Sequence, residues 1–237
     1  MAAESPPVAA PDATEWVRAI ERAYVAAATT GDIDETPIDR DGLAAIAGGQ
    51  RSFHGFAYAG LGAVASHYLA VGSPRTIGII ADAATMPDAV QSLGAHRAWF
   101  APKEARFAHS AVDENLLQLF VSALAGAGIA FRATSHAEAL ACDIVCVHAP
   151  IEVAAAQLRR GTHVNLLHPG ATIDAELRQL ATVSNELPDL GRLAAGLVDG
   201  RKLDELTVFA IGPATLAEAT VARELLREAH AATTLPN

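Results

Sequence analysis

The segment from Arg75 to Ser92 carries the residue pattern closest to a recognisable site. It begins with an apolar run typical of a buried strand, and a helix is expected from about residue 86. Between them, residues 81–86 form a turn with the frame of a G-x-G-x-x-G/A loop. In doubly wound α/β domains, the backbone N–H groups of such a turn bind the pyrophosphate of a dinucleotide. The segment therefore predicts the scaffold of a nucleotide site.

The turn lacks the glycines of that loop, since it reads Ala-Asp-Ala-Ala-Thr-Met. A Cβ at Ala81 or Ala83 would crowd the turn and hold a pyrophosphate away from the backbone. The Asp82 carboxylate would stand where two phosphates should lie, and it would oppose rather than help the helix dipole in binding them. We interpret the turn as a damaged phosphate site.

Nine histidines raise the question of a metal site, and their spacing argues against one. There is no H-x₃-H pair on an expected helix and no Cys/His pairing of the kind that binds zinc. His148 and His168 follow expected neighbouring strands, so both should reach the carboxyl edge of a parallel sheet, where ligands of open α/β sheets bind. Two interpretations stay open for them, a polar pocket at this edge and ordinary loop histidines.

Other reactive patterns are missing or are better explained by structure. The chain has no G-x-S-x-G elbow and no P-loop lysine. Glu186 and Asp189 are read as a solvated helix end rather than as a catalytic carboxylate pair. Cys142 and Cys146 would lie about 13 Å apart on one strand, too far for a disulfide. We expect them to be small buried apolar residues in a reducing compartment.

Composition narrows the classes of partner. A formal net charge of −10 argues against a nucleic-acid binder, which needs a basic face. No apolar run approaches the roughly 20 residues that span a bilayer, and the N-terminus shows no export signal. We therefore expect no nucleic-acid or membrane partner and a cytoplasmic location.

The elements that must position these residues follow an α/β rhythm. Strands are expected near residues 76–81, 97–101, 129–133, 143–148, 162–167 and 206–210. Helices are expected from about 13 to Gly31 and near 55–70, 86–94, 113–126, 136–141, 151–159, 173–181 and 214–230, with a short one possible at 41–47. Nearly continuous apolar strands favour a parallel sheet covered on both faces. The predicted fold class is α/β, a Rossmann-like doubly wound and mainly parallel sheet.

The expected organisation has four parts. Residues 1–12 form a disordered tail, and residues 13–72 form a reduced, helical N-terminal accessory region. Residues 73–212 make the Rossmann-like domain. Residues 213–237 form a C-terminal helix that packs back on the accessory region.

Several short sequence motifs occur in a set order along the chain. They are Gly60-Leu-Gly-Ala-Val-Ala-Ser-His-Tyr-Leu-Ala70, Arg75-Thr-Ile-Gly-Ile-Ile80, Ser135-His-Ala-Glu-Ala, Cys142-Asp-Ile-Val145, Arg160-Gly-Thr-His-Val-Asn165 and Leu206-Thr-Val-Phe209. As an ordered set they resemble the ornithine cyclodeaminase / μ-crystallin family from about residue 55 to 230. The Gly-Thr-His-Val-Asn motif is the most specific of them for this family. The resemblance implies a Rossmann-like fold, NAD(P) binding, action on cyclic imines or α-amino acids, and a homo- or hetero-oligomer.

Carried over to this chain, the resemblance also indicates where a cofactor would make contact. Those positions are Ala81, Asp82, Ala83, Ala84, Thr85, Lys103, His148 and Ala149. Asn165 and His168 would form the edge of the pocket.

The chain departs from the family pattern at the catalytic positions. Ala57 stands where the family has an arginine that grips a substrate carboxylate. The loop after residue 165 has no clear acidic counterpart, because Asp174 is read as the start of a helix. The expected second strand ends without a carboxylate for a ribose, and Lys103 and Arg106 follow it either as 2′-phosphate contacts or as solvated charges. The region before the matching helix is also much shorter than in the family.

Three functions follow from these observations. The first is a divergent family member that has lost NAD(P) binding and catalysis and acts as a scaffold or as the partner subunit of an intact family member. The second is an active NAD(P)-dependent imine reductase or cyclodeaminase on an amino-acid-derived substrate. The third is a small-ligand-binding Rossmann-like domain.

Overall fold

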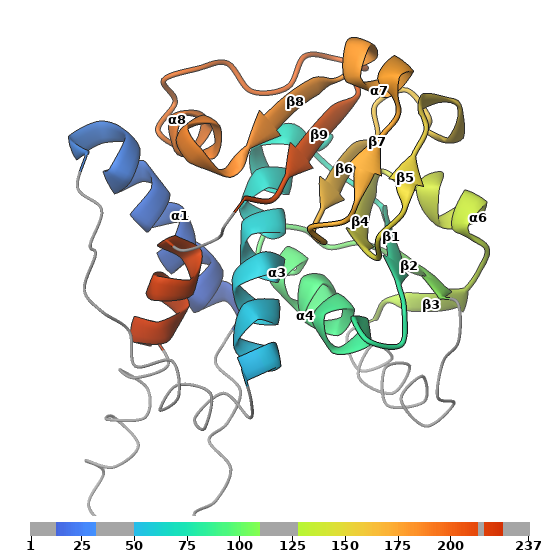
Figure 1. Cartoon of the computed structure of the whole chain (residues 1–237), viewed down its shortest axis with the longest axis horizontal. Helices are drawn as coiled ribbons and strands as arrows, with labels where there is room; N and C mark the ends of the chain where they lie inside the picture. The colour runs from blue at the N-terminus through green and yellow to red at the C-terminus, as the bar shows by residue number, and fades with distance from the viewer. Residues whose placement is uncertain (1–12, 32–49, 110–127, 213–215, 225–237) are drawn as a thin grey trace, which may run out of the picture.

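The main sheet of the protein contains seven strands, all parallel, in the order β3-β2-β1-β4-β6-β9-β8 (Figure 1). This is a computed structural model, and it describes residues 13–31, 50–109, 128–212 and 216–224. The strands are β1 (Thr76–Ala81), β2 (Glu104–His109), β3 (Ala130–Ala133), β4 (Ile144–His148), β6 (His163–Leu166), β8 (Thr182–Asn185) and β9 (Thr207–Ala210). The order turns at β1 and β4, as in doubly wound folds. The predicted fold class is confirmed.

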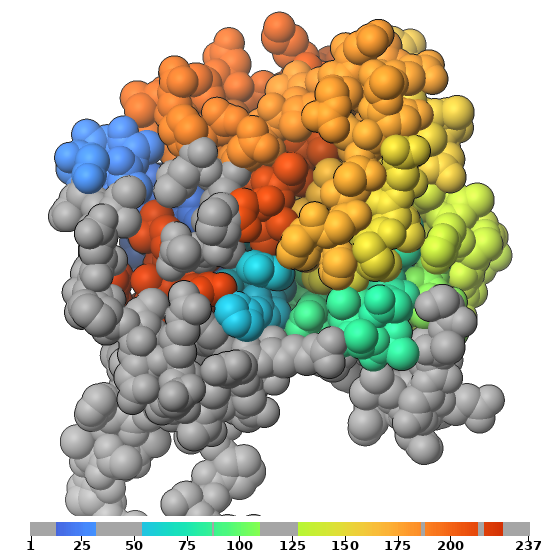
Figure 2. All heavy atoms as spheres, viewed as in Figure 1, coloured from blue at the N-terminus to red at the C-terminus, as the bar shows by residue number. Residues whose placement is uncertain are grey.

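The helices and short elements complete the architecture. They are α1 (Ala13–Thr30), α3 (Gln50–Leu69), α4 (Met86–His96), α6 (His136–Leu140), the 3₁₀ turn η1 (Ala155–Gln157), α7 (Ala175–Leu180), the π-helical turn η2 (Glu186–Leu190) and α8 (Gly191–Ala194). A small parallel sheet joins β5 (Glu152–Val153) to β7 (Thr172–Ile173). The space-filling view shows the yellow and orange segments that carry β5, β7 and α7 as one continuous surface (Figure 2).

Alternation along the strands divides the core into two layers. From β1, Ile77 and Ile79 enter the larger core with α1, α3 and α4, whereas Ile80 enters the smaller core with α6 and α7. All five residues of β4 are buried, because helices cover both faces of the sheet at that strand. Residues 216–224 are helical and lie against α3, where His54 Nδ1 is 2.7 Å from Glu218 Oε1.

Two expected elements are wrong. Residues 97–101 are not a strand, because the N–H groups of Trp99 and Phe100 both donate to the His96 carbonyl and continue the turns at the end of α4. The Trp99 ring packs against His67 at 4.1 Å between ring centroids, so this apolar run covers α3 rather than joining the sheet. The second strand is β2, further along the chain.

The expected helix over residues 151–159 is replaced by β5 and η1. The expected helix over residues 173–181 is present as α7 but shorter, and it is followed by β8, an edge strand that no pattern in the sequence predicted. The predictions for 1–12, 41–47 and 113–126, and that for 214–230 beyond residues 216–224, lie outside the described residues.

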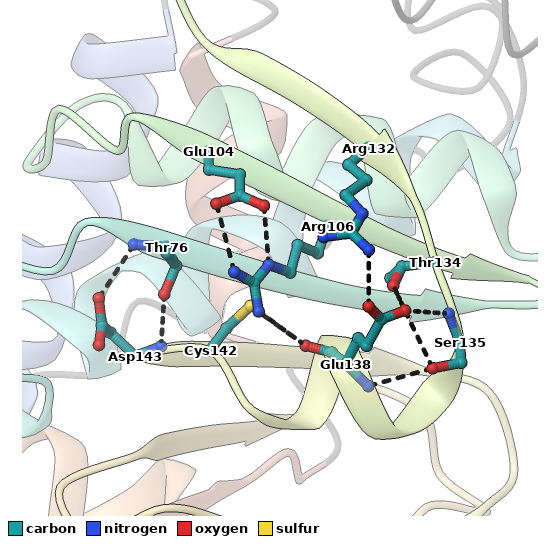
Figure 3. Close-up of polar contacts among 9 residues, drawn as sticks. All are labelled: Thr76, Glu104, Arg106, Arg132, Thr134, Ser135, Glu138, Cys142 and Asp143. Atoms are coloured by element: carbon teal, nitrogen blue, oxygen red, sulfur yellow. Dashed lines mark hydrogen bonds and ion pairs between the residues drawn. The ribbon is translucent and has the colours of Figure 1, made fainter.

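Polar contacts attach α6 to the edge of the sheet (Figure 3). The Ser135 hydroxyl accepts the Glu138 N–H, and the Glu138 carboxylate accepts the Ser135 N–H, which together form a capping box. Arg106 on β2 donates to Glu104 at 2.8 Å and to the Glu138 carbonyl at 3.3 Å. Its guanidinium is therefore used within the α6 side of the sheet and is not available to a 2′-phosphate at the carboxyl edge.

Glycine at residue 78 allows β1 and α6 to approach closely. A Cβ at Gly78 would lie 2.0 Å from the backbone oxygen of Ala139, which no side-chain movement can relieve. We expect Gly78→Ala to lower the free energy of unfolding by about 3 kcal/mol or more, the upper range for overpacking. Gly94→Ala is the matched control, because a Cβ there meets nothing within 4 Å, and it should raise stability by about 0.5–1 kcal/mol in a helix interior. Urea denaturation of the two variants measures both effects, and equal stabilities would contradict this account.

Candidate functional site

The carboxyl edge of the sheet places three described strand ends side by side. Ala81 at the end of β1 pairs with His109 of β2 on one side and with His148 of β4 on the other. Neighbouring residues of a parallel sheet point to the same face, so both imidazoles lie on the α4 side. This is the switch point of the strand order, where doubly wound sheets bind ligands.

The turn after β1 is closed by its own side chains. The Asp82 carboxylate accepts the Thr85 N–H at 2.9 Å, and Thr85 Oγ1 accepts the Asp82 N–H at 3.1 Å. The Ala84 N–H also hydrogen-bonds the Asp82 carboxylate. Desolvation opposes ionisation, but the Thr85 and Ala84 hydrogen bonds outweigh it and hold the pKa of Asp82 below its usual value. The carboxylate therefore occupies the backbone amides that a phosphate would otherwise use.

The N-terminus of α4 has few donors left for an anion. Thr85 is its N-cap and provides no side-chain cap, while Pro87 in the first turn has no N–H. The N–H groups of Asp88 and Ala89 both donate to the Thr85 carbonyl. Asp88 also adds an acidic residue to the first turn, which helix dipoles favour but which repels a phosphate.

Lys103 is not at this edge. It precedes β2, and its N–H donates to the Arg75 carbonyl at 2.8 Å, which places it at the amino end of the sheet. Lys103 was expected beside the turn after β1 because the second strand was expected earlier in the chain, and it lies instead at the opposite end of the sheet. The residue at the carboxyl end of β2 is His109, not Lys103. Its Nδ1 is buried without a hydrogen-bond partner among the described residues. The alternation of Glu104 and Arg106 with apolar residues was the signal that could have located β2.

His148 turns inward from this edge. Its Nε2 is 2.8 Å from Ser92 Oγ on α4, and the residue is buried, as is Ala149. Desolvation lowers the pKa of His148 to about 3, with smaller contributions from the charges of His96 and His168. His168 is half-buried, and its Nδ1 accepts the Gly170 N–H at 2.9 Å. It is close enough to act electrostatically on both His148 and Asp82.

Asn165 does not lie at the pocket edge. It is fully buried on β6, where Nδ2 donates to Ser66 Oγ at 2.8 Å and Oδ1 lies 3.0 Å from His163 Nε2. Asn165 belongs to the strand that crosses under α3, and its side chain faces that helix. Ala57 is likewise fully buried on α3 and offers no polar group.

The cysteines, Asp189 and Asp174 have structural roles. Cys142 and Cys146 are free and buried, and desolvation raises their thiol pKa to about 11 and about 12. Asp189 accepts the Asn185 N–H at 3.1 Å, and Asp174 caps α7 by accepting the Leu177 N–H at 2.7 Å. None of these groups is presented as a nucleophile or general base.

Two hollows open at the amino end of the sheet, away from the edge described above. The larger, of about 440 Å³, is lined by the end of α3 and residues 200–204. Its Arg201 guanidinium is already used, since it donates to the backbone carbonyls of Gly161 and Glu205 at 2.8 and 2.9 Å. In the part of the chain that the structure describes, no group of three or more His, Cys, Asp or Glu residues is arranged to hold a metal. None of the described helices is both long and apolar enough to cross a membrane.

Solved structures share this fold. An archaeal alanine dehydrogenase dimer with bound NAD is 23% identical with a TM-score of 0.63, over 77% of this chain and 66% of that one. A Thermococcus litoralis Δ1-pyrroline-2-carboxylate reductase with NADH and L-proline is 20% identical with a TM-score of 0.64, over 78% and 67%. A probable ornithine cyclodeaminase from Bordetella pertussis Tohama I is 17% identical with a TM-score of 0.63, over 78% and 68%.

The predicted resemblance is thus confirmed as similarity of fold to ornithine-cyclodeaminase-type proteins. The chain spans about two thirds of the length of the first two of these structures. No protein-family model and no curated protein sequence matches the chain.

Three buried histidines should make folding stability depend on pH. Desolvation lowers the pKa of His96 to about 4 and of His148 and His163 to about 3, so the unfolded chain binds more protons than the folded one below about pH 6.5. Stability should therefore fall as the pH drops from about 6.5 toward 4, before the carboxylates titrate. Urea denaturation across that range measures it.

His148→Gln should make the free energy of unfolding depend less steeply on pH, by about one bound proton, because one of the three histidines is removed. Its Ser92 partner can hydrogen-bond the new amide. Equal stability of the wild-type protein at pH 7 and pH 5 would contradict the assignment of these histidines as neutral.

Proposed function

We propose that this protein is a non-redox relative of the NAD(P)-dependent cyclodeaminase and imine-reductase structures whose fold it shares. In this proposal it no longer binds NAD(P) and acts as a scaffold or as one subunit of an oligomer, homomeric or paired with an intact relative. Residues 73–212 would form the Rossmann-like unit, and residues 13–72 would form a reduced accessory region. Residues 213–237 would form a C-terminal helix that packs back on that accessory region.

The observation that carries the proposal is the carboxylate of Asp82 on the turn amides. Thr85 and Ala84 donate to it, so an internal anion already satisfies the donors of the phosphate turn. A dinucleotide would have to displace this carboxylate and accept its negative charge as a neighbour, both of which oppose binding.

The remaining support comes from a catalytic position and from the assembly of a protein with a similar fold. Ala57 is a buried methyl group where the family resemblance calls for a substrate-binding arginine. The alanine dehydrogenase of which the chain spans 66% is described as a dimer with bound NAD. A subunit role without catalysis is consistent with both facts.

A second candidate is a small-ligand site at the carboxyl edge. His109 Nδ1 is buried there without a hydrogen-bond partner among the described residues. Buried polar atoms normally have such a partner, so a ligand could supply it. His168 and Asp82 add polar groups on the neighbouring strand ends. The ligand would be a small polar molecule that can donate to or accept from an imidazole.

Cofactor binding is tested by calorimetric titration of the full chain with NAD(H), NADP(H) and inorganic pyrophosphate. We expect no saturable binding at micromolar concentrations. Asp82→Gly should increase pyrophosphate affinity by about tenfold, because it frees two N–H donors and removes a like charge. Asp199→Asn, an exposed carboxylate beside the smaller hollow at the amino end, removes the same charge and should change nothing.

Micromolar binding of either dinucleotide by the unmodified chain would overturn the proposed loss. It would favour the alternative of an active NAD(P)-dependent imine reductase or cyclodeaminase on an amino-acid-derived substrate.

Assembly is tested by purifying the tagged protein from its native cell under mild conditions. We expect it to sediment as an oligomer, either with itself or with a longer protein of the same fold. A lone monomer at the cellular concentration would refute the subunit role while leaving the cofactor result intact.

A further inference from the structure

A continuous chain of buried hydrogen bonds runs between the sheet and the helices α3 and α4. Its members come from four elements, and none of their side chains reaches solvent. We call it the core hydrogen-bond chain, and it runs from the Ser92 carbonyl through His96, Ser66, Asn165, His163 and Thr207 to the Leu69 carbonyl.

The chain is tightly connected. His96 Nδ1 is 2.7 Å from the Ser92 carbonyl, and His96 Nε2 is 2.9 Å from Ser66 Oγ. At the other end, His163 Nδ1 is 2.9 Å from Thr207 Oγ1, which donates to the Leu69 carbonyl at 2.7 Å. Every contact falls within the normal range for a hydrogen bond.

Both ends of the chain can only accept. A carbonyl has no hydrogen, so His96 must donate through Nδ1 and Thr207 must donate through its hydroxyl. Between the ends, each neutral imidazole, each hydroxyl and the amide of Asn165 can place one hydrogen along the chain. One contact is then left without a hydrogen, whichever way the Asn165 amide is turned.

The amide orientation decides only where the missing hydrogen falls. As oriented, Asn165 Oδ1 faces His163 Nε2, and both of them are acceptors once His163 donates through Nδ1 to Thr207. With the amide reversed, the same deficit moves to His96, which would have to donate through both ring nitrogens. A single added proton on either imidazole completes every contact.

We propose that the core hydrogen-bond chain takes up one proton as the pH falls below neutrality, shared between His96 and His163, while the protein remains folded. Uptake of one proton adds a donor where two acceptors face each other, which converts a repulsive contact into a charge-assisted hydrogen bond. A second proton would have no acceptor left to serve.

The charged and titratable groups around the core hydrogen-bond chain set the pH range in which it takes up the proton. Burial lowers the pKa of both His96 and His163, and the nearby Arg201 guanidinium acts in the same direction on His163. The Cys146 thiol lies 3.8 Å from His96 Nε2 and stays protonated, because desolvation raises its pKa to about 12. His148 also contacts α4, through Ser92 Oγ, and it is neutral for the same reason of burial. These effects all oppose a positive charge in the chain, so uptake is expected only at acidic pH, well below 6.5.

The proton links the core to the carboxyl edge. Ser92 contacts the chain through its carbonyl and His148 through its hydroxyl, so a single residue of α4 touches both. A positive charge at His96 acts unfavourably on a charged His148 and adds to the burial that keeps it neutral.

The decisive measurement is the protonation state of each ring nitrogen, read from ¹⁵N chemical shifts of the full chain between pH 7 and the onset of acid unfolding. We expect one of His96 and His163 to become doubly protonated while the other keeps a single tautomer. Singly protonated rings at both residues down to acid unfolding would overturn the proposal, since the folded protein would then tolerate the contact that lacks a hydrogen without taking up a proton.

Thr207→Val removes the hydroxyl and with it both of its contacts, to His163 Nδ1 and to the Leu69 carbonyl. The remaining contacts match the hydrogens of neutral groups, so neither histidine should become doubly protonated in this variant. Its folding stability should fall more steeply below pH 6.5 than that of the wild type, by about one bound proton, because the folded state no longer takes one up.

Thr220→Val is the matched control. Thr220 is also buried and also donates to a backbone carbonyl, that of Leu216 at 2.8 Å, but it lies outside the chain. It should leave both the ring-nitrogen states and the pH slope as in the wild type. Equal slopes for Thr207→Val and the wild type would count against the proposal.

Discussion

A parallel sheet has to be covered on both faces, and this requirement organises the whole protein. Because all seven strands run the same way, every carboxyl end reaches one edge and every amino end reaches the other. On one face α6 and α7 meet an apolar set that includes Val145, Val164 and Val208. On the other face α3 and α4 cover a layer in which apolar residues share space with histidines, serine and asparagine. Polar groups can be buried there only because each finds a partner across the helix–sheet contact.

Much of the fold could be predicted because its signals are local. The apolar runs of β1 and β4 and the capping box of Ser135 and Glu138 depend on residues close in sequence. β2 was missed because Trp99 and Phe100 look like strand residues but pack over the end of α4. β8 was missed because a four-residue edge strand with a single buried side chain carries almost no periodicity. In each case tertiary packing decided what the local pattern left open.

The candidate site divides in the same way. The turn after β1 was located correctly, since a strand followed by a helix fixes its position, and His148 was placed at the correct edge. The side chain of Asn165 was assigned to the wrong surroundings because a strand pattern does not say which helix lies over it. His109 could not be found once its strand had been misplaced. The bonds between Asp82 and Thr85 needed coordinates, although both residue types are known to close turns of this kind.

The turn closed by Asp82 and Thr85 also bears on how the lineage could change. A glycine-rich loop depends on the absence of side chains, so it tolerates few substitutions, whereas the present turn is held by two side chains that support each other. Glycine at Ala81 or Ala83 alone would loosen the turn and leave the carboxylate on the amides. Removing Asp82 alone would free the amides but keep both Cβ atoms in place. Each single change removes support from the turn, and Asp82→Gly alone is expected to recover only part of an anion site, so a full glycine-rich loop would need several substitutions together.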